Sequence, residues 1–287
     1  MTDVLKLDHV TKRFGGLTAV GDVSFTIKEG EIFGLIGPNG AGKTTIFNLI
    51  TGVYTLTEGE ISFYGDTLAV KDPYGDSFMD GLKRRFFFKA LKPNQIAERG
   101  ITRTFQNIRL FKKMTAFQNV YTACHRSATY GIFASFLPFL PKYRREERML
   151  KEKTETLLKL MGLWEVRDMV SANLPYGMQR KLEIARALAL DPKLLLLDEP
   201  AAGMNPEETI ALMDLIREIR DKFQISVLVI EHHMDLIMGL CDKLYVLNFG
   251  KFLAEGRPEE VQNDPAVVEA YLGSPEEMKE LGGVKDA

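Results

Sequence analysis

The feature that most constrains the fold of this chain is a glycine-rich loop between an apolar strand and a helix. Residues 31–36 form a largely apolar stretch that runs directly into the octapeptide GPNGAGKT at 37–44. A helical pattern follows from 43 to 51, and Gly52 ends it. The octapeptide fits GxxxxGK[ST] in the strand–loop–helix context that a phosphate-binding loop requires.

Each residue type in this loop has a physical reason. Glycines let successive backbone N–H groups turn toward phosphate oxygens, where a Cβ atom would clash. Lys43 places a positive charge near the β- and γ-phosphates, and Thr44 offers a hydroxyl to Mg²⁺. The N-terminus of the following helix adds a partial positive charge. The alternative, a glycine-rich turn with a surface lysine, does not explain the motif and its context together.

A second strand ends in two adjacent carboxylates. Residues 193–197 are apolar after the first position and continue into Asp198 and Glu199. Acids at the end of a buried strand must be solvated, paired or bound to a metal. Asp198 suits the water shell of Mg²⁺, and Glu199 suits a base that orients or deprotonates an attacking water. Taken alone, the pair could equally be a strand end that meets water.

The remaining pattern predicts an α/β fold. Alternating apolar residues indicate half-exposed strands, and continuous apolar runs indicate parallel strands covered on both faces. The first kind is expected around 5–9, 23–27 and 60–64, and the second at 31–36, 193–197, 225–230 and 243–248. Residues 116–190 are mainly helical in pattern, with a proline-rich interruption at 137–141, and 234–241 is a shorter helix. For 66–100 we expect a loop or a small excursion.

Composition excludes several classes of protein. The formal net charge of −2 lacks the basic excess that nucleic-acid binding usually needs. Cys124 and Cys241 have no metal-ligand spacing, so we expect two free thiols in a reducing compartment. The first residues lack the apolar core of a signal peptide, and no run reaches the length of a membrane span. Membrane contact would therefore come through another protein.

The sequence resembles the ABC ATPases over nearly its whole length, and within them the ATP-binding subunits of branched-chain amino acid importers. The stretches that carry the resemblance are RFGGL at 13–17, GPNGAGKTT at 37–45, TFQNIRLF at 104–111, NLPYGMQR at 173–180, LDEPAAG at 197–203, IEH at 230–232 and YLG at 271–273. The first, fourth and last of these are typical of the importer subgroup.

The resemblance implies the fold of a P-loop NTPase core with a parallel sheet, an antiparallel β flank and an inserted helical subdomain. It implies one ABC ATPase domain at 1–273, with a RecA-like core at 1–106 and 180–273, a helical subdomain at about 107–179, and a C-terminal tail at 274–287. The apolar stretch at 131–140 would be either core of the helical subdomain or a surface for the permease or the membrane.

The resemblance also implies a role for individual residues. Phe14 would stack on adenine, or simply pack beside the Gly-Gly turn that follows it. Glu199, His232 and Gln106 would be catalytic, and Mg²⁺ would be bound by Thr44, Gln106 and, through water, Asp198. The remaining ATP-binding positions are Gly37, Pro38, Asn39, Gly40, Ala41, Gly42, Lys43, Thr44 and Thr45.

One segment would bind the ATP of a second subunit. It occupies the place of the LSGGQ signature and consists of Leu174, Pro175, Tyr176, Gly177, Met178 and Gln179. Pro175 stands where relatives have a serine, so both the hydroxyl and the backbone N–H donor are lost there. Gly177 and a helix from 178 to 190 remain, although an ordinary helix start would look the same.

The function implied is ATP hydrolysis coupled to uptake of amino acids, most simply branched-chain ones. Its cofactors would be ATP and Mg²⁺, and its partners a second ABC ATPase subunit, membrane permease subunits and, indirectly, a periplasmic solute-binding protein. The chain would lie at the cytoplasmic face of the inner membrane, and would bind no nucleic acid. The alternatives are an ABC system for urea, amides or lipid, and a non-transport ABC ATPase.

Asn205 has a purely local interpretation. Relatives often have an aspartate here, in the loop after the acidic pair, where it takes part in signalling at the dimer interface. Asn205 followed by Pro206, Glu207 and Glu208 is also a typical helix start, with an N-cap, a proline at the first position and acids in the first turn. We expect capping to be its main role.

Overall fold

The computed structural model describes residues 2–70, 91–127, 141–231 and 234–272. The chain divides into two compact units. The first unit combines residues 1–99 with 216–287, and the second holds residues 100–215. The boundary between them falls inside helix α8 (Pro206–Phe223), which therefore contributes to both units.

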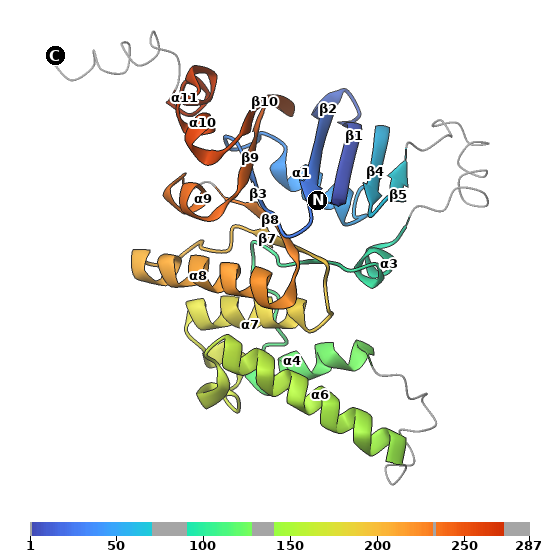
Figure 1. Ribbon diagram of the computed structural model, residues 1–287, viewed down its shortest axis with the longest axis vertical. Coiled ribbons are helices and arrows are strands. Elements are labelled where there is room, and N and C mark those ends of the chain that lie inside the picture. Colours follow the sequence, from blue (N-terminus) through green and yellow to red (C-terminus); the bar gives the residue numbers. More distant parts are fainter. Residues whose placement is uncertain (1, 71–90, 128–140, 232–233, 273–287) are drawn as a thin grey trace, which may run out of the picture. The chain divides into compact units, whose positions relative to one another are not determined.

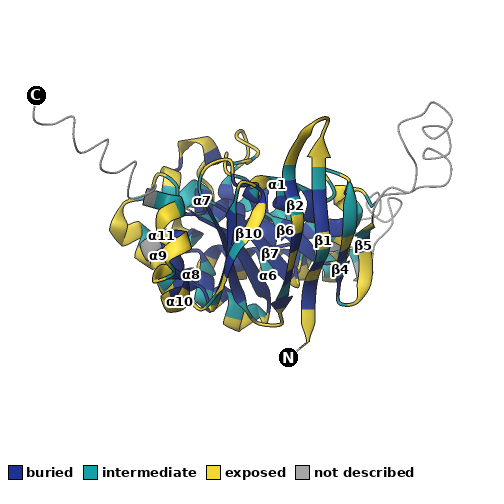
Figure 2. Ribbon diagram, turned by 90° about the horizontal axis from the view of Figure 1, so that it is seen from above, coloured by how far each residue is buried: buried dark blue, intermediate teal, exposed yellow. Residues whose placement is uncertain are grey.

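The first unit contains an antiparallel sheet with the strand order β2-β1-β4-β5 (Figure 1). Its strands are β1 (Asp3–Phe14), β2 (Leu17–Lys28), β4 (Glu58–Phe63) and β5 (Asp66–Val70). Figure 2 shows β1 buried along its middle and exposed at its ends. The predicted alternation at 5–9 fails at His9, because the β1–β2 pairing shifts register between Leu7 and Val10 and leaves His9 exposed with a φ of 49°.

The first unit also contains three parallel strands and one antiparallel strand in the order β10-β9-β3-β8. They are β3 (Ile32–Ile36), β8 (Ser226–Ile230), β9 (Lys243–Asn248) and β10 (Lys251–Gly256). Every residue of β3 and β8 is buried, as a parallel sheet covered on both faces requires. The continuous apolar runs therefore predicted these strands to within one residue.

Five helices lie wholly within the described part of the first unit. They are α1 (Lys43–Ile50), α3 (Pro93–Glu98), α9 (Met234–Leu240), α10 (Pro258–Gln262) and α11 (Pro265–Leu272). Helix α1 begins where the motif predicts and ends one residue earlier than expected. Gly52 follows it with a φ of 69°, and a Cβ there would lie 2.7 Å from the carbonyl oxygen of Leu91, so only glycine fits this turn.

The second unit pairs two short parallel strands with helices. Strand β6 (Ile101–Arg103) lies beside β7 (Leu194–Asp198), and all of β7 is buried. The helices are α4 (Ala116–Cys124), α6 (Pro141–Leu160), α7 (Tyr176–Leu188) and the first part of α8, with 3₁₀ turns at His125–Ser127, Trp164–Val166 and Ser171–Asn173.

Helix α8 begins as its sequence predicts. The Asn205 side chain accepts a hydrogen bond from the Glu208 N–H at 2.9 Å, and the Glu208 carboxylate accepts one from the Asn205 N–H at 3.1 Å. This reciprocal arrangement is a capping box that satisfies two N–H groups at the helix end. The predicted capping role of Asn205 is confirmed.

Some elements differ from the sequence-based expectations. Residues 66–70 and 93–98 are not loop. Residues 66–70 form a strand that pairs with β4, and residues 93–98 form a helix with Pro93 at its first position. Helix α7 begins at Tyr176 rather than 178, with Pro175 as its N-cap residue. The apolar stretch at 131–140 lies outside the described residues.

Two further expectations concern membrane contact and thiols. Among the described residues, no helix is both long and apolar enough to cross a bilayer. Cys124 and Cys241 are buried free thiols, as predicted.

Candidate active site

The phosphate-binding loop follows β3 in the first unit and contains three glycines with positive φ. These are Gly37, Gly40 and Gly42, at 149°, 80° and 100°. A Cβ at Gly37 would lie 2.1 Å from the carbonyl oxygen of Leu247, so any side chain there would displace the loop from β9. The loop geometry therefore depends on glycine at this position.

Lys43 closes the loop on itself. Its ammonium donates hydrogen bonds to the carbonyl oxygens of Gly37 at 2.5 Å and Pro38 at 3.0 Å, and the residue is only 8% exposed. Thr44, by contrast, is exposed at the first turn of α1. The Lys43 ammonium is thus held against the loop, where its positive charge would attract an anion bound by the loop N–H groups.

A neighbouring hairpin turn holds the far end of the same loop. The N–H of Gly250, between β9 and β10, donates to the carbonyl oxygen of Ala41 at 3.1 Å. The Gly250 carbonyl in turn accepts from the N–H of Gly21 on β2 at 2.8 Å. Since a Cβ at Gly42 or Gly250 would come within 2.7 Å of the Ala19 carbonyl, the backbones meet here without side chains between them.

Phe14 ends β1 and is 42% exposed. Its ring makes an edge contact with Tyr54, at 5.1 Å between centroids, and the ammonium of Lys12 lies 4.8 Å from its centroid. Partial burial beside these rings lowers the pKa of Lys12. Phe14 is therefore fixed by neighbours on some sides and keeps exposed aromatic surface.

The second unit brings Gln106 and Glu199 together. The Gln106 side-chain amide donates to a Glu199 carboxylate oxygen at 2.9 Å. Glu199 directly follows β7 and has a φ of 46°, a left-handed conformation that costs a non-glycine residue on the order of 1–3 kcal/mol. Backbone strain of this kind concentrates at functional sites, where the surrounding structure imposes it.

Asp198 has a partner that the sequence did not reveal. The Arg103 guanidinium donates to its carboxylate at 2.7 Å, and the two side chains are only 8% and 5% exposed. Strands β6 and β7 place them side by side. Ninety-five positions separate the two residues in the chain, so only the strand pairing could have identified the contact.

Helix α7 holds the loop that contains Gln106. Arg180 is fully buried, and its guanidinium donates to the carbonyl oxygens of Phe105 at 2.6 Å and Gln106 at 2.8 Å. It also pairs with Glu183 at 2.9 Å. Glu183 accepts hydrogen bonds from the N–H of Arg109 at 3.1 Å and of Phe105 at 3.4 Å.

The buried pair of Arg180 and Glu183 is thus bonded to both ends of the 105–109 loop. Burial raises the pKa of Glu183, and the bonds from Arg109 and Arg180 oppose that effect. Motif analysis missed both residues, although a charged i, i+3 pair on the buried side of an amphipathic helix was a usable signal.

The segment at 174–179 forms the start of α7. The first-turn N–H groups, from Tyr176 to Met178, have no partner within the helix. The Gln179 side chain bonds back to the Leu174 carbonyl at 2.8 Å, which fixes the approach to the helix. A Cβ at Gly177 would lie 3.3 Å from a Glu208 carboxylate oxygen, so this glycine packs against the start of α8.

His232 lies outside the described residues. The phosphate-binding loop belongs to the first unit, and Gln106, Asp198 and Glu199 to the second. Among the described residues, no group of three or more His, Cys, Asp or Glu side chains is arranged to hold a metal.

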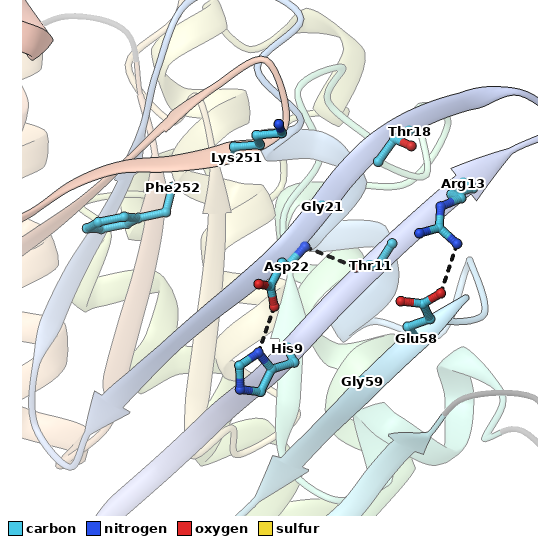
Figure 3. Close-up of a pocket in the computed structure, with 10 residues that line it drawn as sticks. All are labelled: His9, Thr11, Arg13, Thr18, Gly21, Asp22, Glu58, Gly59, Lys251 and Phe252. Carbon is cyan, nitrogen blue, oxygen red and sulfur yellow. Dashed lines mark hydrogen bonds and ion pairs between the residues drawn. The ribbon is translucent and has the colours of Figure 1, made fainter.

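A surface hollow of about 770 Å³ lies over the antiparallel sheet, beside β10 (Figure 3). His9 bonds Asp22 at 2.7 Å, and Arg13 bonds Glu58 at 2.8 Å. The bond to Asp22 is the main reason that the pKa of His9 is raised. None of the residues that line the hollow belongs to the phosphate-binding loop, and these charges satisfy one another.

Comparison with known proteins agrees with this geometry. The profile of the ABC transporter family matches residues 20–202, and that of the branched-chain amino acid ATP-binding cassette transporter family matches residues 253–277. Two solved structures, a nucleotide-free cassette and an ADP-bound conformation of a cassette from ABC transporters, each superpose with a TM-score of 0.75 at 30% identity. They cover 95% and 96% of this chain and 100% of their own.

The chain therefore belongs to the ABC transporter family and has the fold of an ATP-binding cassette. The predicted family, fold class and ATPase class are confirmed.

Among its relatives is the high-affinity branched-chain amino acid transport ATP-binding protein LivG of Salmonella typhimurium, 43% identical over 94% of this chain and 98% of the relative. The corresponding protein BraF of Pseudomonas aeruginosa is 41% identical over the same shares. The lipopolysaccharide export protein LptB of Haemophilus influenzae is 30% identical, over 94% of this chain and 97% of its own.

Proposed function

We propose that this chain is the ATP-hydrolysing subunit of an ABC importer for branched-chain amino acids. The observation that carries the proposal is end-to-end similarity above 40% to LivG and BraF, together with the match of residues 253–277 to the importer subgroup. The ATPase subunit does not touch the solute. The cargo assignment therefore rests on subgroup likeness, and the ATPase assignment rests on the site.

The first unit supplies the groups that bind ATP. Loop 37–45 wraps the phosphates with its N–H groups, Lys43 neutralises their charge, and Phe14 stacks on the adenine. Lys43 already bonds two loop carbonyls, so phosphate replaces those partners rather than recruiting a mobile side chain. Because the Lys43 side chain is already ordered, it loses less conformational entropy when ATP binds.

The second unit supplies the groups that act on water. Glu199 orients the attacking water in line with the γ-phosphate, and Gln106 holds the Glu199 carboxylate by the bond observed at 2.9 Å. His232 contacts the γ-phosphate in this scheme. Charge that develops in transfer is stabilised by Lys43 and the loop N–H groups, which are already oriented and need little reorganisation.

The oxygen donors of Thr44, Gln106 and Asp198 fit a Mg²⁺ ion. A hydroxyl, an amide carbonyl and a carboxylate acting through water are the ligand types this hard cation prefers. When bound, the ion would neutralise charge on the phosphates. Because the Gln106 amide N–H₂ group faces Glu199, its carbonyl oxygen is the atom left for the metal.

Two such subunits enclose two ATP molecules in this proposal. Each ATP lies between loop 37–45 of one subunit and segment 174–179 of the other, which presents the N–H groups at the start of α7. Residues 1–273 act as one ABC ATPase domain, with the RecA-like core at 1–106 and 180–273 and the helical subdomain at about 107–179. The dimer docks on membrane permease subunits at the cytoplasmic face.

The test is purification of the assembled transporter from native membranes, followed by reconstitution in vesicles. We expect two permease subunits to copurify, and ATP hydrolysis to rise when a solute-binding protein loaded with leucine, isoleucine or valine is added. A permease that extracts lipid, as the similarity to LptB would allow, refutes the cargo assignment but leaves the ATPase assignment standing.

A further inference from the structure

The C-terminal segment matched by the importer-subgroup profile lies in the same unit as the phosphate-binding loop. Its described part ends in α10 and α11, which pack beside β10 (Figure 1). Val261 and Val267 are each 2% exposed, so the apolar sides of both short helices are buried. The Asp264 side chain between them accepts from the Ala266 N–H at 2.8 Å and fixes the start of α11.

Tyr271, in the last turn of α11, carries a polar group that this packing buries. Its hydroxyl oxygen is sealed from solvent and makes no well-formed hydrogen bond within the described part of the chain. Burial raises the pKa of this phenol to about 12, and the backbone of Gly37 beside it opposes the shift. A hydroxyl buried in this way lowers the stability of the fold until it gains a hydrogen-bond partner.

Gly37 is the first residue of the phosphate-binding loop, and it cannot easily move away. Its φ of 149° and the Leu247 carbonyl, 2.1 Å from a Cβ at this position, confine its backbone. Its carbonyl oxygen accepts the 2.5 Å hydrogen bond from the Lys43 ammonium. Gly37 thus has the lysine ammonium at its carbonyl oxygen and the tyrosine hydroxyl beside its backbone N–H.

We propose that Tyr271 is a positioning residue for the phosphate-binding loop, whose hydroxyl accepts a hydrogen bond from the Gly37 N–H when Lys43 transfers to ATP. The proposal rests on the proposed function, because that role takes Lys43 away from the Gly37 carbonyl. With the lysine gone, Gly37 loses its strongest side-chain tie. The Tyr271 hydroxyl then holds Gly37 through its N–H, on the side opposite the carbonyl. The buried hydroxyl oxygen thereby gains a hydrogen-bond partner.

The consequence is a physical link between the subgroup's C-terminal helix and the ATP site. The YLG motif at 271–273 is typical of the importer subgroup, and no step of the hydrolysis scheme uses it. Placing Tyr271 against Gly37 gives the motif a role in nucleotide affinity.

The test compares Tyr271→Phe with Tyr245→Phe in the full chain. Tyr245 is a matched control, because it is a buried tyrosine of the same unit whose pKa burial also raises to about 12, and its hydroxyl bonds the backbone of Ser24. Each substitution removes one oxygen. The measurements are the Kd of a fluorescent ATP analogue, KM and kcat for ATP, and Tm.

For Tyr271→Phe we expect Kd and KM to rise by about two- to tenfold, the effect of losing one hydrogen bond. The kcat should stay within about twofold, and Tm should be unchanged or slightly higher because a buried hydroxyl without a partner is gone. Tyr245→Phe should lower Tm and leave Kd unchanged. A purely structural Tyr271 would instead lower Tm and the active fraction while Kd and KM stay at the parent values.

A parental Kd in Tyr271→Phe overturns the proposal. The same assay with Lys43→Ala separates that outcome from failure of the proposed function. If Lys43→Ala binds the ATP analogue as tightly as its parent, then loop 37–45 is not the ATP site and the premise itself is wrong. If Lys43→Ala loses binding while Tyr271→Phe does not, only the role of Tyr271 is refuted.

Discussion

At the scale of single residues, strain and burial mark the same places as the motifs. Glu199 has a left-handed φ at the end of a buried strand, and its carboxylate is bonded by Gln106. This left-handed conformation must be imposed by the surrounding structure, here the end of β7 and the turn that follows it. The position of the carboxylate is therefore fixed by the turn and by the Gln106 side chain.

The first prediction concerns that carboxylate. Glu199→Gln keeps the acceptor that Gln106 bonds but removes the charge that polarises water, so turnover should fall more than tenfold with the Kd for ATP unchanged. Single-turnover hydrolysis and analogue binding measure the two effects. Gln106→Ala is the companion variant, and it should lower kcat while the Glu199 carboxylate remains. Wild-type turnover in Glu199→Gln would show that another group activates the water.

At the scale of elements, β7, α7 and the 105–109 loop form a connected group in the second unit. Arg180 and Glu183 bond both ends of the loop, and Gln106 within it bonds Glu199 beyond β7. The helix that begins with segment 174–179 is thus joined to the proposed water-orienting residues through buried polar contacts. A displacement of α7 would therefore move the backbone at Gln106.

The second prediction tests this connection. Arg180→Lys keeps the positive charge, but the single ammonium nitrogen of lysine replaces the two guanidinium nitrogens that reach Phe105, Gln106 and Glu183. We expect kcat to fall by about tenfold, while the isolated chain keeps its affinity for the ATP analogue, since loop 37–45 is intact. Lys181→Ala is the control on the same helix and should behave like the parent. An unchanged kcat in Arg180→Lys would mean that the loop holds its geometry without the guanidinium.

Local patterns predicted elements well and contacts between distant residues poorly. The strand–loop–helix at 31–51, the buried strands and the Asn205 cap all depend on neighbours in the chain, so periodicity and capping rules could find them. The pairs Arg103–Asp198 and Arg180–Phe105 join residues 95 and 75 positions apart. Such contacts follow from strand order and helix packing, which the local patterns of one sequence do not specify.

The same reason explains the errors at element ends. Residues 66–70 open a stretch rich in Gly, Pro and Asp, and they become a strand because β4 offers them an edge to pair with. Tyr271 illustrates the limit for the site. Its motif was visible in the sequence, but its burial beside Gly37 depends on how α11 packs in the first unit.

At the scale of the whole molecule, the proposed dimer depends on the N-terminus of α7 approaching a phosphate of the partner subunit. Gly177 lies at this helix N-terminus and has no side chain. A side chain added there would lie nearest to Glu208. An added negative charge would oppose both the phosphate and Glu208.

The third prediction follows. In a Glu199→Gln background with saturating ATP, we expect dimerisation by light scattering, with a monomer when nucleotide is absent. Gly177→Asp should abolish the ATP-dependent dimer, because it sets a carboxylate against the phosphate. Gly177→Asn is the neutral, equally large control, and it should weaken the dimer far less. If Gly177→Asp dimerises as well as its parent, segment 174–179 does not bind the partner's ATP.

The two buried cysteines make the chain convenient for labelling chemistry. Burial raises the pKa of both Cys124 and Cys241, and since the thiolate is the reactive form, maleimide should leave the native protein almost unmodified at pH 7. A cysteine introduced at exposed Ile210 would then carry a single fluorophore without removal of either native thiol. Mass spectrometry should find one label per folded chain and three after denaturation, so subunit association could be followed by energy transfer in otherwise unaltered protein.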